Sequence, residues 1–315
     1  MINEFADAID LKAVHVVAPT DFVFLCGGQD SPIDEPQPKS LRDAFYKISD
    51  FAPLGKTDVK RAEDVSAFHI LKSGYDDILS FETDFGQLAK LTLLFSESHG
   101  SSAELGAFCL VSEIARRMLV VVRSKHYEES SFIKFGAIEL MKTTYGEFSH
   151  FVIDDTDLAL KAGSPTPDTV AALKALMQDP IERRLSEIEN PTTFDRNKAG
   201  HVTKLVVGLV QEFGALTEEE VTTLLVLFDI DLNVPQLRRY LLCAEVADWV
   251  MLKRKGFRNY AVARNLPRDA ANFRFLPGTL DRTATRRRAD RRATIKAQDK
   301  ERFSVILDGI GGANV

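Results

Sequence analysis

The sequence predicts an α/β fold, in which a Rossmann-like parallel sheet is followed by a mostly α-helical winged helix-turn-helix domain. Three observations predict it. Apolar runs of strand length alternate with helical segments over residues 1–160, which is typical of a parallel sheet covered by helices. The segment AGSPTPDT (162–169) has the small residues and prolines of a linker. The pattern after it is helical and ends in a basic segment that could form two strands.

The first domain, residues 1–160, is expected to hold four strands. They are predicted at 21–28 (DFVFLCGG), 91–95 (LTLLF), 118–124 (MLVVVRS) and 150–154 (HFVID). Helical spacing of apolar residues predicts helices at 41–48, 79–90 and 102–117. Ligands of such sheets bind at the carboxyl ends of the strands, so the residues that follow each strand are the candidates for a site.

Two strand ends carry candidate substrate-binding residues. Gly27 and Gly28 would let the backbone approach a phosphate or a ribose, although a tight turn also explains them. The segment SESHGSSAE supplies a second group, which is Glu97, Ser98, Gly100 and Ser101. Glu82 either points into the same crevice or is a solvated carboxylate on a helix.

Glu104 lies where the strand at 91–95 gives way to a helix. One interpretation is a capping box, with Ser101 as the N-cap residue and Glu104 three residues later. The other is catalytic: a carboxylate in a first helical turn is stabilised by the helix dipole, stays ionised and can attack a sugar carbon. The two roles are compatible.

Residues 165–280 are expected to form the second domain. Helices are predicted at 204–214, 217–228 and 234–249, followed by a hairpin over 249–264 that turns at Lys255-Gly256, in the order of a winged helix. Trp249 and Tyr260 are expected in its core. The candidate nucleic-acid-binding residues start the third helix or line the wing: Gln236, Arg238, Arg239, Lys253, Arg254, Lys255 and Arg258. The alternative is that these are solvated charges on a helical protein-interaction domain.

The net charge of −6 is unevenly distributed. Residues 1–160 carry 15 Lys and Arg against 26 Asp and Glu, whereas residues 161–315 carry 25 against 20. Within the basic tail (281–315), the segment 282–302 carries nine basic residues against three acidic ones and is expected to be a solvated helix or an arm. Only the second half therefore has the positive field that nucleic-acid binding requires.

The composition excludes several classes of protein. No apolar run approaches the roughly 20 residues of a membrane span, and the acidic N-terminal segment is unlike a signal peptide. The three cysteines are scattered without CxxC spacing, so buried thiols in a reduced cytoplasmic protein are expected. The six histidines show no HExxH motif or paired spacing, and no metal site is expected.

The motifs FLCGG, SESHGSSAELGAF and SSFIKFGAIELM occur in an order and at a spacing that resemble one family. The chain is similar to the nucleoside deoxyribosyltransferase-like effector proteins of bacterial retrons over residues 20–145, and in architecture beyond them. The resemblance implies cleavage of an N-glycosidic bond, a role as an antiphage toxin, and control by a reverse transcriptase and its multicopy single-stranded DNA or RNA. Assembly into a homo-oligomer or filament is left open.

The block GSSAELG also resembles the GTxxExG block of the transferases themselves, which implies that Glu104 is the nucleophile. Those enzymes carry an aspartate six residues before it, and Ser98 stands there in this chain. The substitution argues against ordinary nucleoside transfer and favours NAD as the substrate, because nicotinamide leaves as a neutral base without being protonated. No cofactor is expected.

Two alternatives to this N-glycosidase remain. In the first, a nucleotide-sensing DNA-binding regulator, Glu104 is only a capping residue and the winged helix is the active part. The second is a phosphoribohydrolase-like enzyme, which shares the G-[ST]-x-x-E block but whose PGG turn is not found here.

Overall fold

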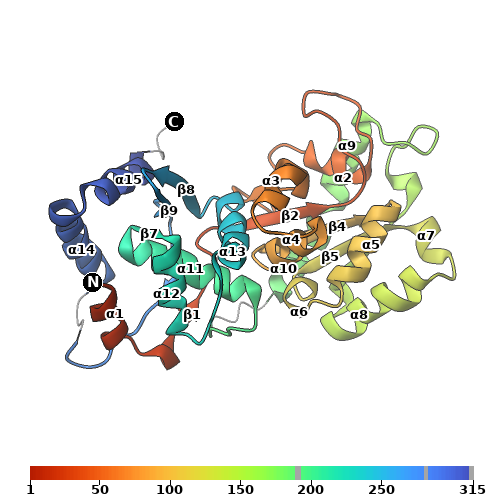
Figure 1. The fold of residues 1–315 in the computed structure, drawn as a ribbon. Coiled ribbons are helices and arrows are strands. Elements are labelled where there is room, and N and C mark those ends of the chain that lie inside the picture. Colours follow the sequence, from red (N-terminus) through yellow and green to blue (C-terminus); the bar gives the residue numbers. More distant parts are fainter. Residues whose placement is uncertain (189–192, 280–282, 312–315) are drawn as a thin grey trace. The chain divides into compact units, whose positions relative to one another are not determined.

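The computed structural model describes residues 1–188, 193–279 and 283–311. The chain divides into two compact units, and each is discontinuous in sequence (Figure 1). The α/β unit contains Asp21–Val65 and Ala89–Glu189. The helical unit contains Met1–Thr20, Ser66–Leu88 and Asn190–Val315. These units do not coincide with the predicted boundary near residue 160.

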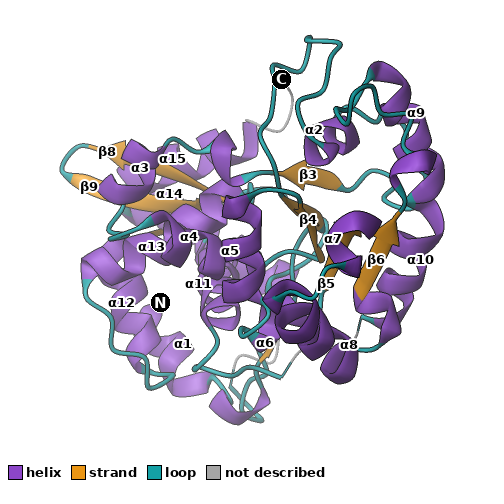
Figure 2. Ribbon diagram, turned by 90° about the vertical axis from the view of Figure 1, so that its right-hand side faces the viewer, coloured by secondary structure: helices purple, strands orange, loops and turns teal. Residues whose placement is uncertain are grey.

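The α/β unit is built on a five-stranded parallel sheet with the order β3-β2-β4-β5-β6 (Figure 2). Its strands are β2 (Phe22–Cys26), β3 (Asp58–Lys60), β4 (Leu91–Ser96), β5 (Met118–Arg123) and β6 (His150–Ile153). The four predicted strands are confirmed, and β3, a short edge strand, was not predicted. The chain leaves β2 toward β3 on one side and returns to β4 on the other. This reversal makes the carboxyl ends of β2 and β4 the switch point where ligands of such sheets bind.

Helices of the α/β unit follow most strands. They are α2 (Leu41–Tyr46), α5 (His99–Phe108), α6 (Ser112–Ala115), α7 (Ser124–Glu128), α8 (Glu139–Tyr145), α9 (Pro167–Leu176) and α10 (Gln178–Glu187). The single helix predicted over 102–117 is instead two helices, α5 and α6. The break occurs because Val111 adopts an extended conformation between them.

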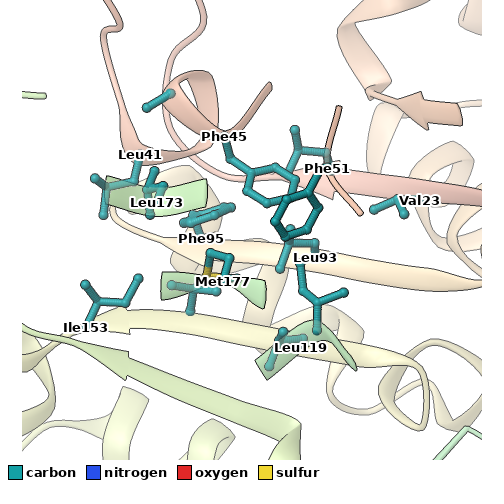
Figure 3. Packing of buried hydrophobic residues seen from close by; sticks show 14 of the residues in the cluster. Val23, Leu41, Phe45, Phe51, Leu93, Phe95, Leu119, Ile153, Leu173 and Met177 are labelled. Carbon is teal, nitrogen blue, oxygen red and sulfur yellow. The ribbon is translucent and has the colours of Figure 1, made fainter. Parts of the chain in front are cut away.

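Alternate strand residues pack against helices on opposite faces of the sheet, as the pleat requires. On one face Leu93 and Phe95 belong to a buried cluster with residues of α2, α9 and α10, including Leu173 and Met177 (Figure 3). On the other face Phe24 lies 6.3 Å from Phe108 of α5, measured between ring centroids. The segment after AGSPTPDT therefore completes the core of the α/β unit, although the sequence assigned it to the second domain.

The helical unit contains eight helices and two small sheets within the described residues. Its helices are α1 (Ile2–Ala8), α3 (Ala67–Lys72), α4 (Ile78–Gly86), α11 (Ala199–Phe213), α12 (Glu218–Val226), α13 (Val234–Val246), α14 (Ala284–Gln298) and α15 (Lys300–Gly311). Its strands are β1 (His15–Val16), β7 (Ala215–Thr217), β8 (Val250–Lys255), β9 (Arg258–Ala263) and β10 (Ala271–Asn272). Antiparallel pairs give the sheets β1-β10 and β7-β9-β8.

The predicted order of three helices and a hairpin is found as α11, α12, α13, β8 and β9. A short strand, β7, separates α11 from α12 and was missed because three residues give no readable periodicity. Trp249 and Tyr260 are buried as expected, and so are the three free cysteines. No helix of the described chain is long and apolar enough to cross a membrane.

The basic tail is not the solvated segment that its composition predicts. Its described part folds into α14 and α15, and Arg287 and Arg291 of α14 are buried. Arg287 stacks over the ring of Phe275 and Arg291 over that of Phe213, at 4.3 Å and 4.6 Å from the ring centroids. Guanidinium groups bury readily against aromatic faces, so a count of charges does not identify a solvated helix.

Candidate active site

The loop after β4 starts α5 differently from the sequence-based expectation. Ser98 is the N-cap residue: its Oγ accepts a hydrogen bond from the Ser101 backbone N–H at 3.1 Å, and the Ser101 hydroxyl accepts one from the Ser98 N–H at 2.9 Å. The capping box is thus Ser98–Ser101, and the predicted Ser101–Glu104 box is wrong. Glu104 lies one turn farther along α5, where it contributes nothing to capping.

Glu97 joins the ends of β2 and β4. One carboxylate oxygen accepts from the Gly28 N–H at 3.2 Å and the Arg42 N–H at 2.9 Å, and the other accepts from the Leu41 N–H at 2.7 Å. The side chain therefore satisfies the first N–H groups of α2 and holds the loop after β2. Both oxygens are occupied, which leaves Glu97 as a positioning residue.

The glycine pair after β2 is explained by the protein itself. A Cβ atom at Gly27, where φ is +154°, would lie 2.8 Å from the Cβ of Arg42. One at Gly28 would lie 2.9 Å from Oε1 of Glu97. The close approach expected of these glycines is therefore made to Arg42 and Glu97, which pack against the turn.

Glu104 faces the beginning of α2 and the segment after β3. It is partly buried, and its Oε2 atom is buried without a hydrogen-bond partner among the described residues. Burial, reinforced by the negative charge of Glu63 and opposed by Arg42, raises the pKa of Glu104 from 4.5 to about 7. Desolvation thus makes this carboxylate harder to ionise than the helix dipole alone would predict.

Arg42 is the cation whose charge acts on this carboxylate. Only 3% of its side chain is exposed, and it donates to Glu63 at 2.7 Å while its Nε is buried and unpartnered. Arg61 lies nearby, pairs with Asp30 at 3.0 Å and stacks over the ring of Tyr46 at 4.0 Å. Two buried polar atoms, Oε2 of Glu104 and Nε of Arg42, thus lack a hydrogen-bond partner within the described residues.

A pocket of about 340 Å³ lies on the other side of α5, over the ends of β4 and β5. Ser98, His99 and Ser102 from the start of α5 line it, together with His126 and Ser131. Glu104 is not among the lining residues. Helix α5 therefore presents two surfaces, a hydroxyl-rich pocket and the face that carries Glu104.

Gly100 and Glu82 are the remaining predicted substrate-binding residues. Gly100 is the second residue of α5, and Glu82 is on α4 in the helical unit. Among residues 1–188, 193–279 and 283–311, no group of three or more His, Cys, Asp or Glu side chains could hold a metal ion.

The predicted nucleic-acid-binding residues of α13 all make contacts within the helical unit. Gln236 accepts from the Asn233 N–H in a capping box, at 3.0 Å. Arg238 donates twice to Glu218, at 2.7 and 2.9 Å, and Arg239 donates to Asp76 at 2.7 Å. Helix α13 also packs against α4. The start of α13 is therefore occupied by internal partners.

The hairpin β8–β9 is more accessible. Lys253 pairs with Asp308, and Arg258 lies 3.8 Å from Asp299. Arg254 and Lys255 are exposed and have no ion pair in the described part of the chain. Phe257 at the turn is fully exposed. These three side chains form the unpartnered tip of the hairpin.

Sequence reasoning missed Arg42 and Glu63, whose charges act on Glu104, and Arg61, which shares Asp30 with Arg42. One signal was available for Arg42. It stands in the first turn of a helix capped by Ser40, where the dipole favours anions and a cation needs compensation. The partner that compensates it, Glu63, is 21 residues away, and only the fold brings it close.

These features define a class: an α/β protein whose parallel sheet has a partly buried carboxylate of raised pKa at its switch point. A family model described as "STM3845 retron effector protein" matches residues 38–252. The chain belongs to this family of retron effectors. The matched range includes Arg42, Glu97 and Glu104 and extends into β8.

Two curated relatives from Escherichia coli are similar to parts of the chain. The "Retron Ec86 putative ribosyltransferase/DNA-binding protein" is 30% identical over 121 residues, which cover 38% of this chain and 37% of that protein. The "Retron Ec73 putative ribosyltransferase/DNA-binding protein" is 31% identical over 77 residues, 24% of each chain. The chain thus matches 37% of the length of the first relative and 24% of the length of the second.

Proposed function

We propose that the α/β unit is an N-glycosidase in which Glu104 is the nucleophile. The observation that carries the proposal is the buried Oε2 of Glu104, which lacks a hydrogen-bond partner within the described structure. Glu104 attacks C1′ of a ribose, the C1′–N bond breaks, and the bonding pair leaves with the base. Water then cleaves the sugar ester and regenerates the carboxylate. The ribosyltransferase names of the two relatives support this reaction class.

The charges around Glu104 favour a substrate that is positive at the reacting base. At Glu104 the negative charge of Glu63 acts more strongly than the positive charge of Arg42. With a pKa of about 7, Glu104 is about half neutral at pH 7 before substrate binds. A cation such as the nicotinamide ring of NAD would favour its ionised, nucleophilic form. NAD is therefore the proposed substrate.

Neither candidate acid at the same site is free to protonate a neutral leaving base. Ser98 and Glu97, the candidates for an acid that would protonate the leaving base, are both used to hold the backbone. General acid assistance is typically worth about 10²–10⁴ in rate. The protein is expected to release nicotinamide from NAD about 10²–10⁴ times faster than it releases base from deoxyinosine or deoxyadenosine. Liquid chromatography of parallel reactions measures both rates.

Two outcomes would contradict the proposal at different points. Deoxynucleosides cleaved as fast as NAD, with that activity lost in Glu97→Gln, would make Glu97 the acid and remove the NAD preference. Absence of base release from every nucleotide and nucleoside by the intact effector, with its partners present, would favour the nucleotide-sensing regulator.

We further propose that the effector works in antiphage defence in the cytoplasm. A reverse transcriptase and its multicopy single-stranded DNA control its activity. The order α11, β7, α12, α13, β8 and β9 supports a winged helix, with the hairpin β8–β9 as the wing. Because the cations of α13 are paired internally, the wing tip is the proposed nucleic-acid contact. The exposed Phe257 could stack on an unpaired base there.

Reversal of the wing charges tests this contact. The double variant Arg254→Glu, Lys255→Glu is expected to bind single-stranded DNA at least about tenfold more weakly, with a shallower salt dependence, because fewer counterions are released. Fluorescence anisotropy over a range of salt concentrations measures both effects. The control is Arg183→Glu, which reverses an exposed charge in the α/β unit. Equal losses in the control and the wing variant would rule out a wing-specific contact.

A further inference from the structure

A second pocket, of about 310 Å³, lies within the helical unit and plays no part in the proposed chemistry. The end of α11 forms one wall, the segment after β9 another, and α14 a third. Arg264, Arg288 and Arg292 line it, with Glu212 and Asp269 as the lining carboxylates. The positive side chains therefore outnumber the negative ones at the pocket surface.

The carboxylate of Glu212 already accepts hydrogen bonds from three arginines. It is completely buried and accepts from Arg287 at 2.9 Å, from Arg288 at 3.3 Å and from Arg291. The other lining carboxylate, Asp269, pairs with Arg288 at 2.8 Å. Both lining carboxylates therefore already have arginine partners.

Arg292 adds a further charge to the same pocket. It follows Arg288 by four residues, which places both on one face of α14. Arg292 is exposed, and the described structure gives it no ion pair or hydrogen bond. Arg264 also lines the pocket, and its nearest carboxylate, that of Asp248, is 3.7 Å away. Among the lining side chains, three arginines face two carboxylates, which leaves a net charge of about +1.

We infer that this pocket binds a phosphate group. A phosphate group is attracted by the excess positive charge of the lining, and guanidinium groups bind its oxygens in pairs of parallel hydrogen bonds. Arg292 and the exposed part of Arg288 contact the phosphate. The phosphate comes either from a free nucleotide or from the 5′ end of a single-stranded nucleic acid. The site depends neither on Glu104 nor on the wing.

The test uses the full chain and calorimetric titration at pH 7.5 and fixed ionic strength. The probes are inorganic pyrophosphate and two short oligodeoxynucleotides that differ only in a 5′ phosphate. Arg292→Gln is expected to weaken binding of the phosphate probe by at least about tenfold, the loss of one charge-assisted hydrogen bond. Arg286→Gln, which removes the same charge from an exposed position of α14, is the matched control and should bind as the wild type does.

The pattern of binding identifies the source of the phosphate. Tight pyrophosphate binding without preference between the oligonucleotides indicates a free nucleotide, whereas preference for the 5′-phosphorylated strand indicates a nucleic-acid end. Retention of binding in Glu104→Gln separates this site from the proposed glycosidase. Equal affinities of wild type and Arg292→Gln for every probe, or no binding of any probe by the wild type, would overturn the inference.

Discussion

Glu104→Gln is expected to reduce base release by at least about 10³-fold, because an amide cannot replace a carboxylate as the nucleophile. The wild-type rate should itself rise with pH through about 7, as the raised pKa of Glu104 requires the carboxylate to ionise before it attacks. The measurement is the initial rate of nicotinamide release between pH 5.5 and 8.5.

The same substitution is expected to stabilise the fold in alkaline solution. Folding raises the pKa of Glu104 from 4.5 to about 7, so the folded state binds the proton more tightly and loses stability as the pH rises through this window. Gln resembles the neutral acid and does not incur this loss. Glu104→Gln should therefore match the wild type near pH 4.5 and exceed its free energy of unfolding by about 2–3 kcal/mol at pH 8.

Urea unfolding at both pH values measures this difference. Glu139→Gln is the control, because it neutralises an exposed carboxylate in the same unit and should change neither activity nor the pH dependence of stability. Loss of activity together with loss of stability at pH 8 would assign Glu104 a structural role. Full activity of Glu104→Gln would remove it from the catalytic site.

Arg184→Met is expected to lower the free energy of unfolding by about 3–5 kcal/mol. The Arg184 side chain is 2% exposed and lies on α10. It donates to the carbonyl oxygens of Ala115, Arg116, Met118 and Tyr145 at 2.9–3.2 Å. Met keeps the apolar volume but donates no hydrogen bond, so these buried carbonyls lose their donor.

The neighbouring Arg183 provides a matched control. Its side chain is 54% exposed and pairs with Asp179 one turn away, so Arg183→Met should cost less than about 1 kcal/mol. Far-ultraviolet circular dichroism during urea unfolding compares the two variants. Similar unfolding midpoints for Arg184→Met and the wild type would mean that water or a rearranged backbone replaces the arginine.

Local patterns in the sequence predicted much of the fold. The runs that became β2, β4 and β5 are largely apolar, and a strand buried on both faces needs no other signal. The edge strand β6 is only partly buried, and its apolar residues Phe151, Val152 and Ile153 were enough to predict it. The apolar periodicity of α11 and the turn between β8 and β9 were equally local. Strands β3 and β7, of three residues each, were missed because their pairing partners rather than their composition define them.

The candidate site was predicted only in part. The position of Glu104 after β4 follows from the sequence, because an apolar run of strand length is followed there by a segment with helical spacing. Its electrostatic state does not follow, since Glu63 and Arg42 are 41 and 62 residues away along the chain. The predicted cap at Ser101 was one turn too late, because several serines in that turn are equally suited to cap a helix.

The sequence by itself determined the parallel sheet and the glutamate beyond the carboxyl end of its strand β4. It also determined the helices and hairpin of the second half and the uneven distribution of charge. Only the tertiary structure decided where the units divide, which arginines are buried, and that Glu104 has a pKa of about 7. The physical reason is the distance along the chain over which each property is determined. Strand and helix periodicity depends on near neighbours in the chain, whereas burial and charge pairing depend on residues that only folding brings together.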